Sequence, residues 1–246
     1  MFGRRAFAIT LGLLLATALV FAWFPELDLA AARLFGTAGG FILNRDRDLI
    51  SLRQVGLIAP MMVAGVCVLA LVWPAFRPGA RLFTDARNLV AILLTLTLGP
   101  GLLVNVGLKD HWHRPRPVQV QEFGGPSEFR PWWDMRGACA RNCSFVSGEV
   151  AGATAMVLVA AVMPAEMAGS AIIIALIFAV GVALLRMAFG GHFLSDVLFA
   201  ALLTHLVAIV VFSLMRDERW RVGRAGQLEE MVGGFGSRLR ARLGCL

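Results

Sequence analysis

The stretch Leu185-Arg186-Met187-Ala188-Phe189-Gly190-Gly191-His192-Phe193-Leu194-Ser195-Asp196 lies between two apolar runs, each long enough to enter a lipid bilayer. A cation, an imidazole and a carboxylate are costly to bury at a membrane boundary, so such groups usually have a chemical role. A helix that starts near His192 would place Asp196 on the same face, where its carboxylate can orient the ring. The Gly190-Gly191 turn can fold Arg186 back toward it. By itself, the stretch also fits a loop with a snorkelling Arg and a helix-capping Asp.

The composition is that of an integral membrane protein. Of the 246 residues, 58% are hydrophobic and 16% are charged, whereas about a quarter of the residues of a soluble domain are charged. The net charge is +7, and Lys109 is the single lysine among 22 arginines. Basic residues in so apolar a chain are typical of the cytoplasmic flanks of membrane spans, and nucleic-acid binding is not expected. Because arginine is the general cation of this chain, Lys109 is a candidate for a specific role.

Six apolar runs predict an all-α bundle of six transmembrane helices. A span needs roughly 20 residues to cross about 30 Å of hydrocarbon. The runs cover residues 6–24, 55–73, 88–108, 148–163, 170–185 and 196–214. We therefore expect one membrane domain over 1–215, followed by a basic cytoplasmic tail over 216–246.

An even number of spans places both termini on one side of the membrane. Arg4, Arg5 and the arginines of loop 74–87 and of the tail lie on that side, and the positive-inside rule makes it the cytoplasm. The basic residues of loops 25–54 and 109–147 count against this orientation unless they have a chemical role. In this orientation, loop 109–147 and the Arg186–His192 turn emerge together on the external face.

Two of the four cysteines, Cys139 and Cys143, share the long external loop. In an oxidising compartment they can form a small disulfide, and two free thiols are the alternative. No pair of cysteines has the spacing of a zinc ribbon.

Two further stretches lie at external ends of the expected spans. The stretch Lys109-Asp110-His111-Trp112-His113-Arg114-Pro115-Arg116-Pro117 supplies cations that can hold an anion, since Arg offers a planar fork and Lys a compact charge. The stretch Cys143-Ser144-Phe145-Val146-Ser147-Gly148-Glu149 opens a helix, where the hydroxyl and free N–H groups of Ser147-Gly148 suit an anion. Taken singly, the first fits a basic cluster against lipid head groups and the second a helix cap.

Taken together, the three stretches resemble the motifs of the type-2 phosphatidic acid phosphatase (PAP2) superfamily of membrane lipid phosphatases. The first motif of that family, Lys, six residues, then Arg-Pro, is intact from Lys109 to Arg116-Pro117. The resemblance covers residues 109–196 and the six-span layout.

The other two family motifs are kept in part. The third is Ser-Arg, five residues, His, three residues, Asp; the Arg, His and Asp are kept, and Leu185 replaces the Ser. The second is Pro-Ser-Gly-His, of which Ser147-Gly148 are kept between Val146 and Glu149. The replacement at Glu149 puts the source of the leaving-group proton in doubt.

The resemblance implies covalent catalysis without a metal or other cofactor. His192 would attack phosphorus, oriented by Asp196, and water would hydrolyse the resulting phosphohistidine. The groups expected to hold the phosphate oxygens are Lys109, Arg116, Ser147, Gly148 and Arg186.

Glu149 stands where the family has the His that protonates the leaving group. A carboxyl with an ordinary pKa of about 4.3 can do this only if its pKa is raised toward neutrality. Three alternatives remain open. Glu149 is the general acid; or it holds a phosphate-binding Arg or caps its helix; or His111 or His113 supplies the proton.

The resemblance also implies a phosphorylated lipid as substrate, in a bacterial inner membrane, with the site facing the periplasm. Lipid A, undecaprenyl diphosphate, phosphatidylglycerol phosphate and phosphatidic acid are candidates, and residues 143–149 are similar to a bacterial branch of lipid A phosphatases. Alternatives are a lipid phosphotransferase using the same phosphohistidine, a non-catalytic lipid-binding membrane protein, and an inactive homologue. No protein partner is predicted.

Overall fold

The regular secondary structure in the described part of the chain is helical. The computed structural model describes residues 3–77, 82, 84–216 and 234, so nearly all of the expected tail 216–246 lies outside the described residues. Within them there are two isolated β-bridges and no strand. The longer elements are α1 (Arg4–Trp23), α3 (Arg47–Phe76), α4 (Ala86–Leu96) continued by the π-helix η2 (Thr97–Leu108), α5 (Gly148–Ala155) continued by the 3-10 helix η5 (Met156–Val162), α6 (Ala165–Ala188) and α7 (Leu194–Arg216). The short ones are α2 (Glu26–Arg33), η1 (Ile42–Arg45), η3 (Pro117–Gln119) and η4 (Gln121–Phe123).

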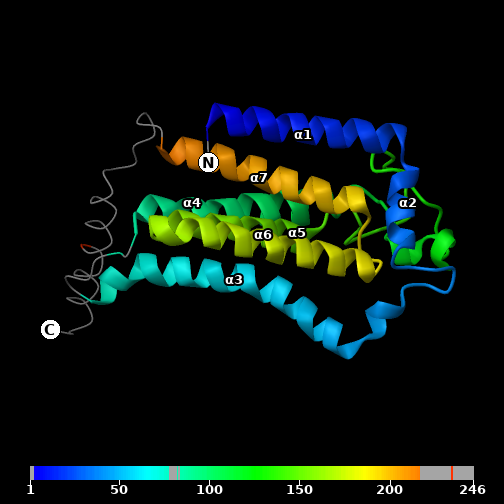
Figure 1. Ribbon diagram of the computed structural model, residues 1–246, viewed down its shortest axis with the longest axis horizontal. Helices are drawn as coiled ribbons and strands as arrows, with labels where there is room; N and C mark the ends of the chain where they lie inside the picture. The colour runs from blue at the N-terminus through cyan, green and yellow to red at the C-terminus, as the bar shows by residue number, and fades with distance from the viewer. Residues whose placement is uncertain (1–2, 78–81, 83, 217–233, 235–246) are drawn as a thin grey trace.

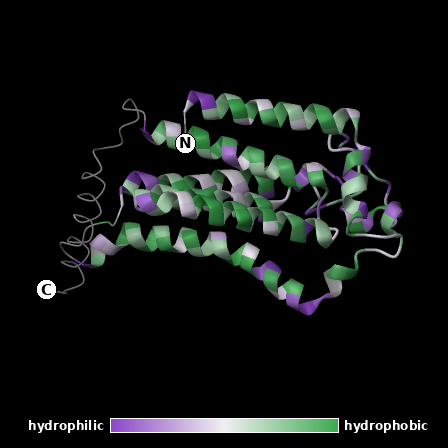
Figure 2. Ribbon diagram, in the orientation of Figure 1, coloured by the Kyte–Doolittle hydropathy of each residue, from purple (hydrophilic) through white to green (hydrophobic). Residues whose placement is uncertain are grey.

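The long helices lie side by side in one bundle (Figure 1). Five of them, α1, α3, α4 with η2, α6 and α7, are long and apolar enough to cross a membrane, and α5 with η5 is a shorter apolar helix. Figure 2 shows apolar residues along the middle of the helices and polar residues mainly at their ends and in the connections. The predicted all-α membrane fold is confirmed, although the fourth predicted span, α5 with η5, is shorter than the other five.

The two ends of the bundle differ in what they carry. The first residues of α1 and the last of α7 lie at one end, and α2 and loop 109–147 lie at the other (Figure 1). The start of α5 and the α6–α7 turn belong to this second end, so all three chemistry-bearing stretches meet there.

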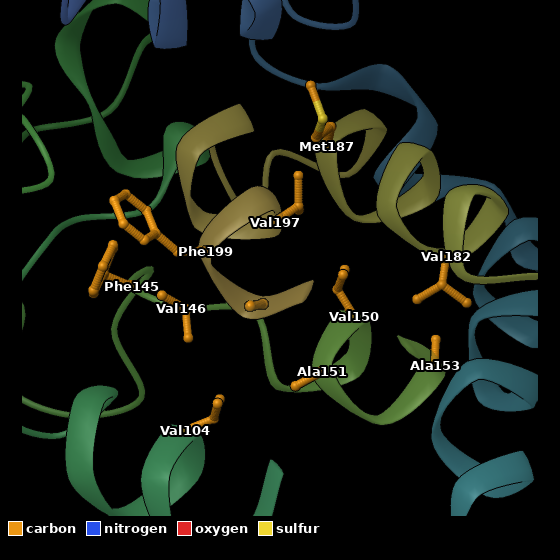
Figure 3. Close-up of a cluster of buried hydrophobic side chains, with 11 residues drawn as sticks. Val104, Phe145, Val146, Val150, Ala151, Ala153, Val182, Met187, Val197 and Phe199 are labelled. Atoms are coloured by element: carbon orange, nitrogen blue, oxygen red, sulfur yellow. The ribbon is translucent and has the colours of Figure 1, made fainter. Parts of the chain in front are cut away.

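The short helix α5 is enclosed by its neighbours. Its small residues Ala151, Gly152, Ala153 and Ala155 are buried, and small residues let helices pack closely. A Cβ added at Gly152 would lie 3.0 Å from Pro60 of α3. Figure 3 shows side chains from η2, α5, α6 and α7 converging in a buried apolar core beside this helix. This core fixes the start of α5 relative to the α6–α7 turn.

Two of the helix starts that differ from those expected bear on the site. The second span begins at Arg47 rather than Val55, because the Asp46 carboxylate caps it by accepting hydrogen bonds from the N–H groups of Asp48 and Leu49. Part of the expected polar connection 25–54 is therefore helical. The last helix begins at Leu194, so His192 precedes it instead of sharing a helical face with Asp196.

Loop 109–147 is held together by a disulfide and by backbone hydrogen bonds between its two ends. Cys139 and Cys143 form a disulfide, which decides between the two alternatives left open by the sequence. The N–H of Cys143 donates to the carbonyl of Lys109 at 3.0 Å, and the N–H of Ser144 donates to that of Arg114 at 2.9 Å. The first and second motif stretches therefore run beside one another.

Candidate active site

A cavity of about 390 Å³ lies between α3, η2, α5 and α6 at the end of the bundle that carries loop 109–147. Its polar lining consists of Arg53, Asn105, Lys109, Arg116, Asn142, Glu149, Arg186 and His192. Its apolar lining, from positions farther along α3 and the α4–η2 helix, includes Leu57, Met61, Ala64, Leu96 and Pro100. The cavity therefore joins a cationic region to an apolar one, as a site for an amphipathic anion requires.

The predicted site residues divide into two groups. The cavity is lined by Lys109, Arg116, Gly148, Glu149, Arg186 and His192. Ser147 and Asp196 do not line it; both are fully buried behind its wall. The structure thus brings six of the eight residues around one space and places the other two in supporting positions.

His192 is held by a backbone carbonyl rather than directly by a carboxylate. Its Nδ1 lies 2.7 Å from the carbonyl oxygen of Ser144, whereas Asp196 Oδ2 is 3.9 Å away, beyond hydrogen-bond distance. A carbonyl can only accept, so Nδ1 carries the proton and Nε2 keeps its lone pair. Nε2, with its free lone pair, is therefore the atom that can act as a nucleophile.

The imidazole is neutral at neutral pH. Burial lowers the pKa of His192 well below its ordinary value, and the charges of Arg186, Arg116 and Lys109 lower it further. A neutral ring next to several cations is suited to attack an anionic group that those cations bind.

The two cations of the first motif differ in their surroundings. Burial lowers the pKa of Lys109 to about 8, and the neighbouring charge of Arg116 contributes to this. The Arg116 guanidinium donates to the carbonyl oxygen of Asn142 at 2.8 Å and to its Oδ1 at 2.9 Å. Asn142 therefore fixes the direction of Arg116.

Arg186 lies in the last turn of α6 and is 3% exposed. Its Nε is 3.3 Å from Glu149 Oε1, an ion pair without hydrogen-bond geometry, and has no other acceptor among the described residues. A buried donor without a partner costs about 1–3 kcal/mol. A bound anion in the cavity would remove that cost.

The start of α5 faces the cavity. Ser147 is the N-cap, and its hydroxyl accepts a bond from the N–H of Val150 at 3.4 Å, so this side chain stabilises the helix rather than lining the cavity. A Cβ added at Gly148 would press against Asn105 Oδ1 and lie 3.0 Å from Lys109 Nζ. Glycine at 148 therefore leaves room for the lysine beside the positive end of the α5 dipole.

Glu149 is paired with two arginines, accepting hydrogen bonds from Arg53 and forming an ion pair with Arg186. Arg53 donates from Nε to both carboxylate oxygens at 3.1 Å and from Nη2 to Oε1 at 2.8 Å. This is the interaction of an ionised carboxylate with a guanidinium fork. Of the alternatives for Glu149, the observed geometry is that of a group that holds arginines.

Arg53 was missed by the sequence analysis, which placed it in a loop. The signal that could have found it is Asp46, a helix-capping residue one position before Arg47. Asn105 and Asn142 were also missed, and no local pattern distinguishes them from other polar residues near span ends.

The profile of the family described as "PAP2 superfamily" matches residues 88–220, which is more than half of the chain. The chain belongs to the PAP2 superfamily. The family predicted from the three stretches is therefore confirmed. All of those stretches lie inside the matched range, whereas Arg53 lies outside it.

Three relatives of this PAP2 protein are each 35% identical to it and carry the name lipid A 4′-phosphatase. The protein of Francisella tularensis subsp. novicida (strain U112) aligns over 220 residues, 85% of this chain and 96% of its own length. Those of Rhizobium leguminosarum and Rhizobium etli each align over 210 residues, 80% of this chain and 88% and 80% of their own lengths. No solved structure matches. With the family and the apolar helices, these relatives confirm the predicted enzyme class: the PAP2 protein is a multi-pass membrane protein and a lipid phosphate phosphatase.

Proposed function

We propose that this PAP2 protein hydrolyses a phosphate monoester of lipid A through a phosphohistidine formed on His192. The observation that carries the proposal is the cavity in which Lys109, Arg116 and Arg186 surround a neutral imidazole. The names of the three relatives support lipid A over undecaprenyl diphosphate, phosphatidylglycerol phosphate and phosphatidic acid. The apolar lining along α3 and η2 suits acyl chains.

In the first step, Nε2 of His192 attacks phosphorus, and the bond from phosphorus to the lipid oxygen breaks. The proton carried by the phosphate monoester monoanion passes to the lipid oxygen, which leaves as a hydroxyl group. The bond from Nδ1–H to the carbonyl of Ser144 stabilises the positive charge that develops on the ring. In the second step, water attacks the phosphohistidine, inorganic phosphate leaves and the neutral ring is restored.

The phosphate oxygens are held by Lys109, Arg116 and Arg186, with the N–H groups at the start of α5 near Gly148. Glu149 acts by orienting Arg186 and Arg53 rather than as the proton donor, because its oxygens already accept from the Arg53 guanidinium and Oε1 is ion-paired with Arg186. His111 and His113 do not line the cavity. Their Nδ1 atoms contact the carbonyls of Gly107 and Cys139, which does not favour a catalytic role.

The proposed location is a bacterial inner membrane, with the cavity facing the periplasm and both ends of the membrane domain 1–215 facing the cytoplasm. The disulfide Cys139–Cys143 lies at the cavity end, and disulfides persist in oxidising compartments such as the periplasm. The arginines at the start of α1, together with Arg77 at the end of α3 and Arg87 in the first turn of α4, belong to the opposite end, as the positive-inside rule requires of the cytoplasmic face.

The test is phosphate release by the purified protein in detergent, with a panel of lipid A and the three other candidate lipids. We expect release from lipid A by the wild type and none by His192→Ala. Acid-labile phosphate on the wild-type protein, trapped by rapid quenching, would report the phosphohistidine. Equal rates for wild type and His192→Ala would overturn the mechanism, and preference for another lipid would overturn the substrate. Transfer of phosphate to an added acceptor lipid would identify a phosphotransferase.

A further inference from the structure

A buried polar cluster lies behind His192, on the side away from the cavity. Its members are Asp28, Arg114, Ser144, Ser195 and Asp196, each no more than 1% exposed. None of them lines the cavity. Asp196 is the only member that the family motifs had singled out, so the cluster contains charged groups to which the proposed reaction gives no role.

Arg114 is the centre of this cluster. Its Nη1 donates to Asp196 Oδ1 at 2.6 Å, and its Nη2 donates to Asp28 Oδ2 at 2.7 Å. Its guanidinium carbon lies 4.4 Å from the centre of the Phe193 ring, so this ring also restricts the orientation of the guanidinium group. Burial acts to lower the pKa of Arg114, but the charges of Asp196 and Asp28 more than offset it and the pKa is raised. The guanidinium is therefore a permanent cation shared by two carboxylates.

The cluster reaches His192 through Ser144. The Ser144 hydroxyl donates to Asp196 Oδ2 at 2.5 Å, and its N–H donates to the carbonyl of Arg114 at 2.9 Å. The Ser144 carbonyl, in turn, accepts from Nδ1 of His192 at 2.7 Å. The cluster thus holds Ser144 by its hydroxyl and its N–H group. The Ser144 carbonyl in turn sets the tautomer and orientation of His192.

Asp28 reaches the cluster from α2, outside the region that matches the family profile. Besides Arg114, it accepts from the N–H of Ser195 at 2.8 Å and from its hydroxyl at 2.6 Å. The acid therefore fixes both Arg114 and the first turn of α7, which carries Asp196.

The energetics argue against a purely stabilising role. Removing three charges from water costs several kcal/mol per ion, and well-packed apolar residues of similar volume often give equal or greater stability. Buried ionic groups of this kind are better explained by the geometry they impose, and here that geometry ends at the nucleophile.

We propose that Asp28 and Arg114 are positioning residues for His192, acting through Asp196 and Ser144. The inference rests on the proposed role of His192 as nucleophile and extends the site to an acid on α2. It separates two functions in space: the cavity cations bind phosphate, and the buried cluster orients the imidazole that attacks it.

The experiment compares Asp28→Asn and Ser144→Ala with the wild type, using lipid A in detergent. Three quantities are measured: kcat, KM and the inhibition constant of inorganic phosphate. We expect kcat to fall about tenfold or more in both variants, since small errors in the position of a reacting group have effects of this size. KM and phosphate inhibition should stay within about twofold because the cavity cations are unchanged. Asp134→Asn is the matched control: Asp134 is also a buried loop acid between two arginines, Arg130 and Arg136, but its carboxylate contacts no member of the cluster.

A wild-type kcat in Ser144→Ala would overturn the proposal, because the side chain of Asp196 acts on Ser144 through that hydroxyl. Parallel loss of kcat and phosphate inhibition would also overturn it, since the cluster would then only hold the fold. If Asp28→Asn does not fold, the small substitution Ser144→Ala decides the question. Failure of the proposed function is distinguishable, because the wild type itself would then release no phosphate or His192→Ala would match it.

Discussion

Arg53 and Glu149, 96 positions apart in the chain, form a forked ion pair that joins α3 to the first turn of α5. Arg53 is about one-third exposed and Glu149 is buried. The pair lies in the wall of the cavity, and Glu149 extends it to Arg186. A carboxylate at 149 thus determines where two cations lie, and the function of each can be tested separately.

Substitution of Glu149 should affect substrates with good and poor leaving groups equally. Glu149→Ala leaves Arg186 buried without its ion pair, and we expect kcat/KM to fall about 10- to 100-fold, with a smaller effect for Glu149→Gln, whose amide oxygen can still accept. The measurement is kcat/KM for lipid A and for p-nitrophenyl phosphate. If Glu149 were instead the general acid, only the lipid, with its poor leaving group, would be hydrolysed slowly.

Removal of the Arg53 side chain should weaken substrate binding. We expect Arg53→Gln to raise KM about tenfold with a smaller change in kcat, because a hydrogen-bonded charge in the cavity is lost. Arg47→Gln is the matched control, since Arg47 lies on the same helix, is exposed and does not line the cavity. Equal KM values for both variants would show that Arg53 contributes no more to substrate binding than Arg47 does.

The pH dependence should show an alkaline limb due to Lys109. Lysine is cationic below its pKa, which burial lowers to about 8 in the free enzyme. As the pH rises through this value the cavity loses a phosphate-binding charge, so kcat/KM should fall, whereas bound phosphate would raise the pKa and protect kcat. Lys109→Arg should move this limb to higher pH, because arginine stays charged. An unchanged limb in that variant would assign it to another group.

A methyl group at position 148 should displace Lys109. Gly148→Ala would press on Asn105 and on the lysine ammonium, which would lie 3.0 Å from the new carbon, and we expect kcat/KM to fall about tenfold. Gly169→Ala is the control, because its Cβ would meet nothing within 4 Å. Wild-type phosphate release by Gly148→Ala would mean that the lysine moves without consequence.

The disulfide should support Arg116 through Asn142. A crosslink that closes so short a loop contributes about 2 kcal/mol in the chain-entropy model. The Cys139→Ser/Cys143→Ser variant should therefore unfold at lower temperature and show a higher KM, since Asn142 orients Arg116 from within the closed loop. A reductant should reproduce these effects in the wild type and add nothing in the variant. If a reductant lowers the activity of both proteins equally, its target is not this bond.

The parts of the site that could be predicted from the sequence are those encoded by local spacing. Lys109 and Arg116 are seven positions apart in one stretch, and the ends of apolar runs place Arg186 and His192 at a membrane boundary. The same reasoning failed to include Arg53 because the helix was expected to begin where the apolar run begins. A capped polar turn extends it, and hydropathy alone does not detect such a turn.

The relation between His192 and Asp196 shows a second limit. A spacing of four suggested direct contact, but the helix starts after the histidine, and the contact runs through Ser144, which is 52 positions from Asp196 in the chain. The contact of Asp28 with the buried polar cluster could not be predicted from the sequence either. Its role depends on the packing of α2 against the start of α7, which no local pattern encodes.

The ion pair of Asp28 with Arg114 has a practical consequence for anyone who wishes to shorten this enzyme. The family profile begins at residue 88, so its boundary separates Asp28 from Arg114 in the chain. A fragment cut there would retain all three motif stretches and yet lack one of the two acids paired with the buried Arg114 guanidinium. Minimal catalysts built from this scaffold must keep the amino-terminal third of the chain.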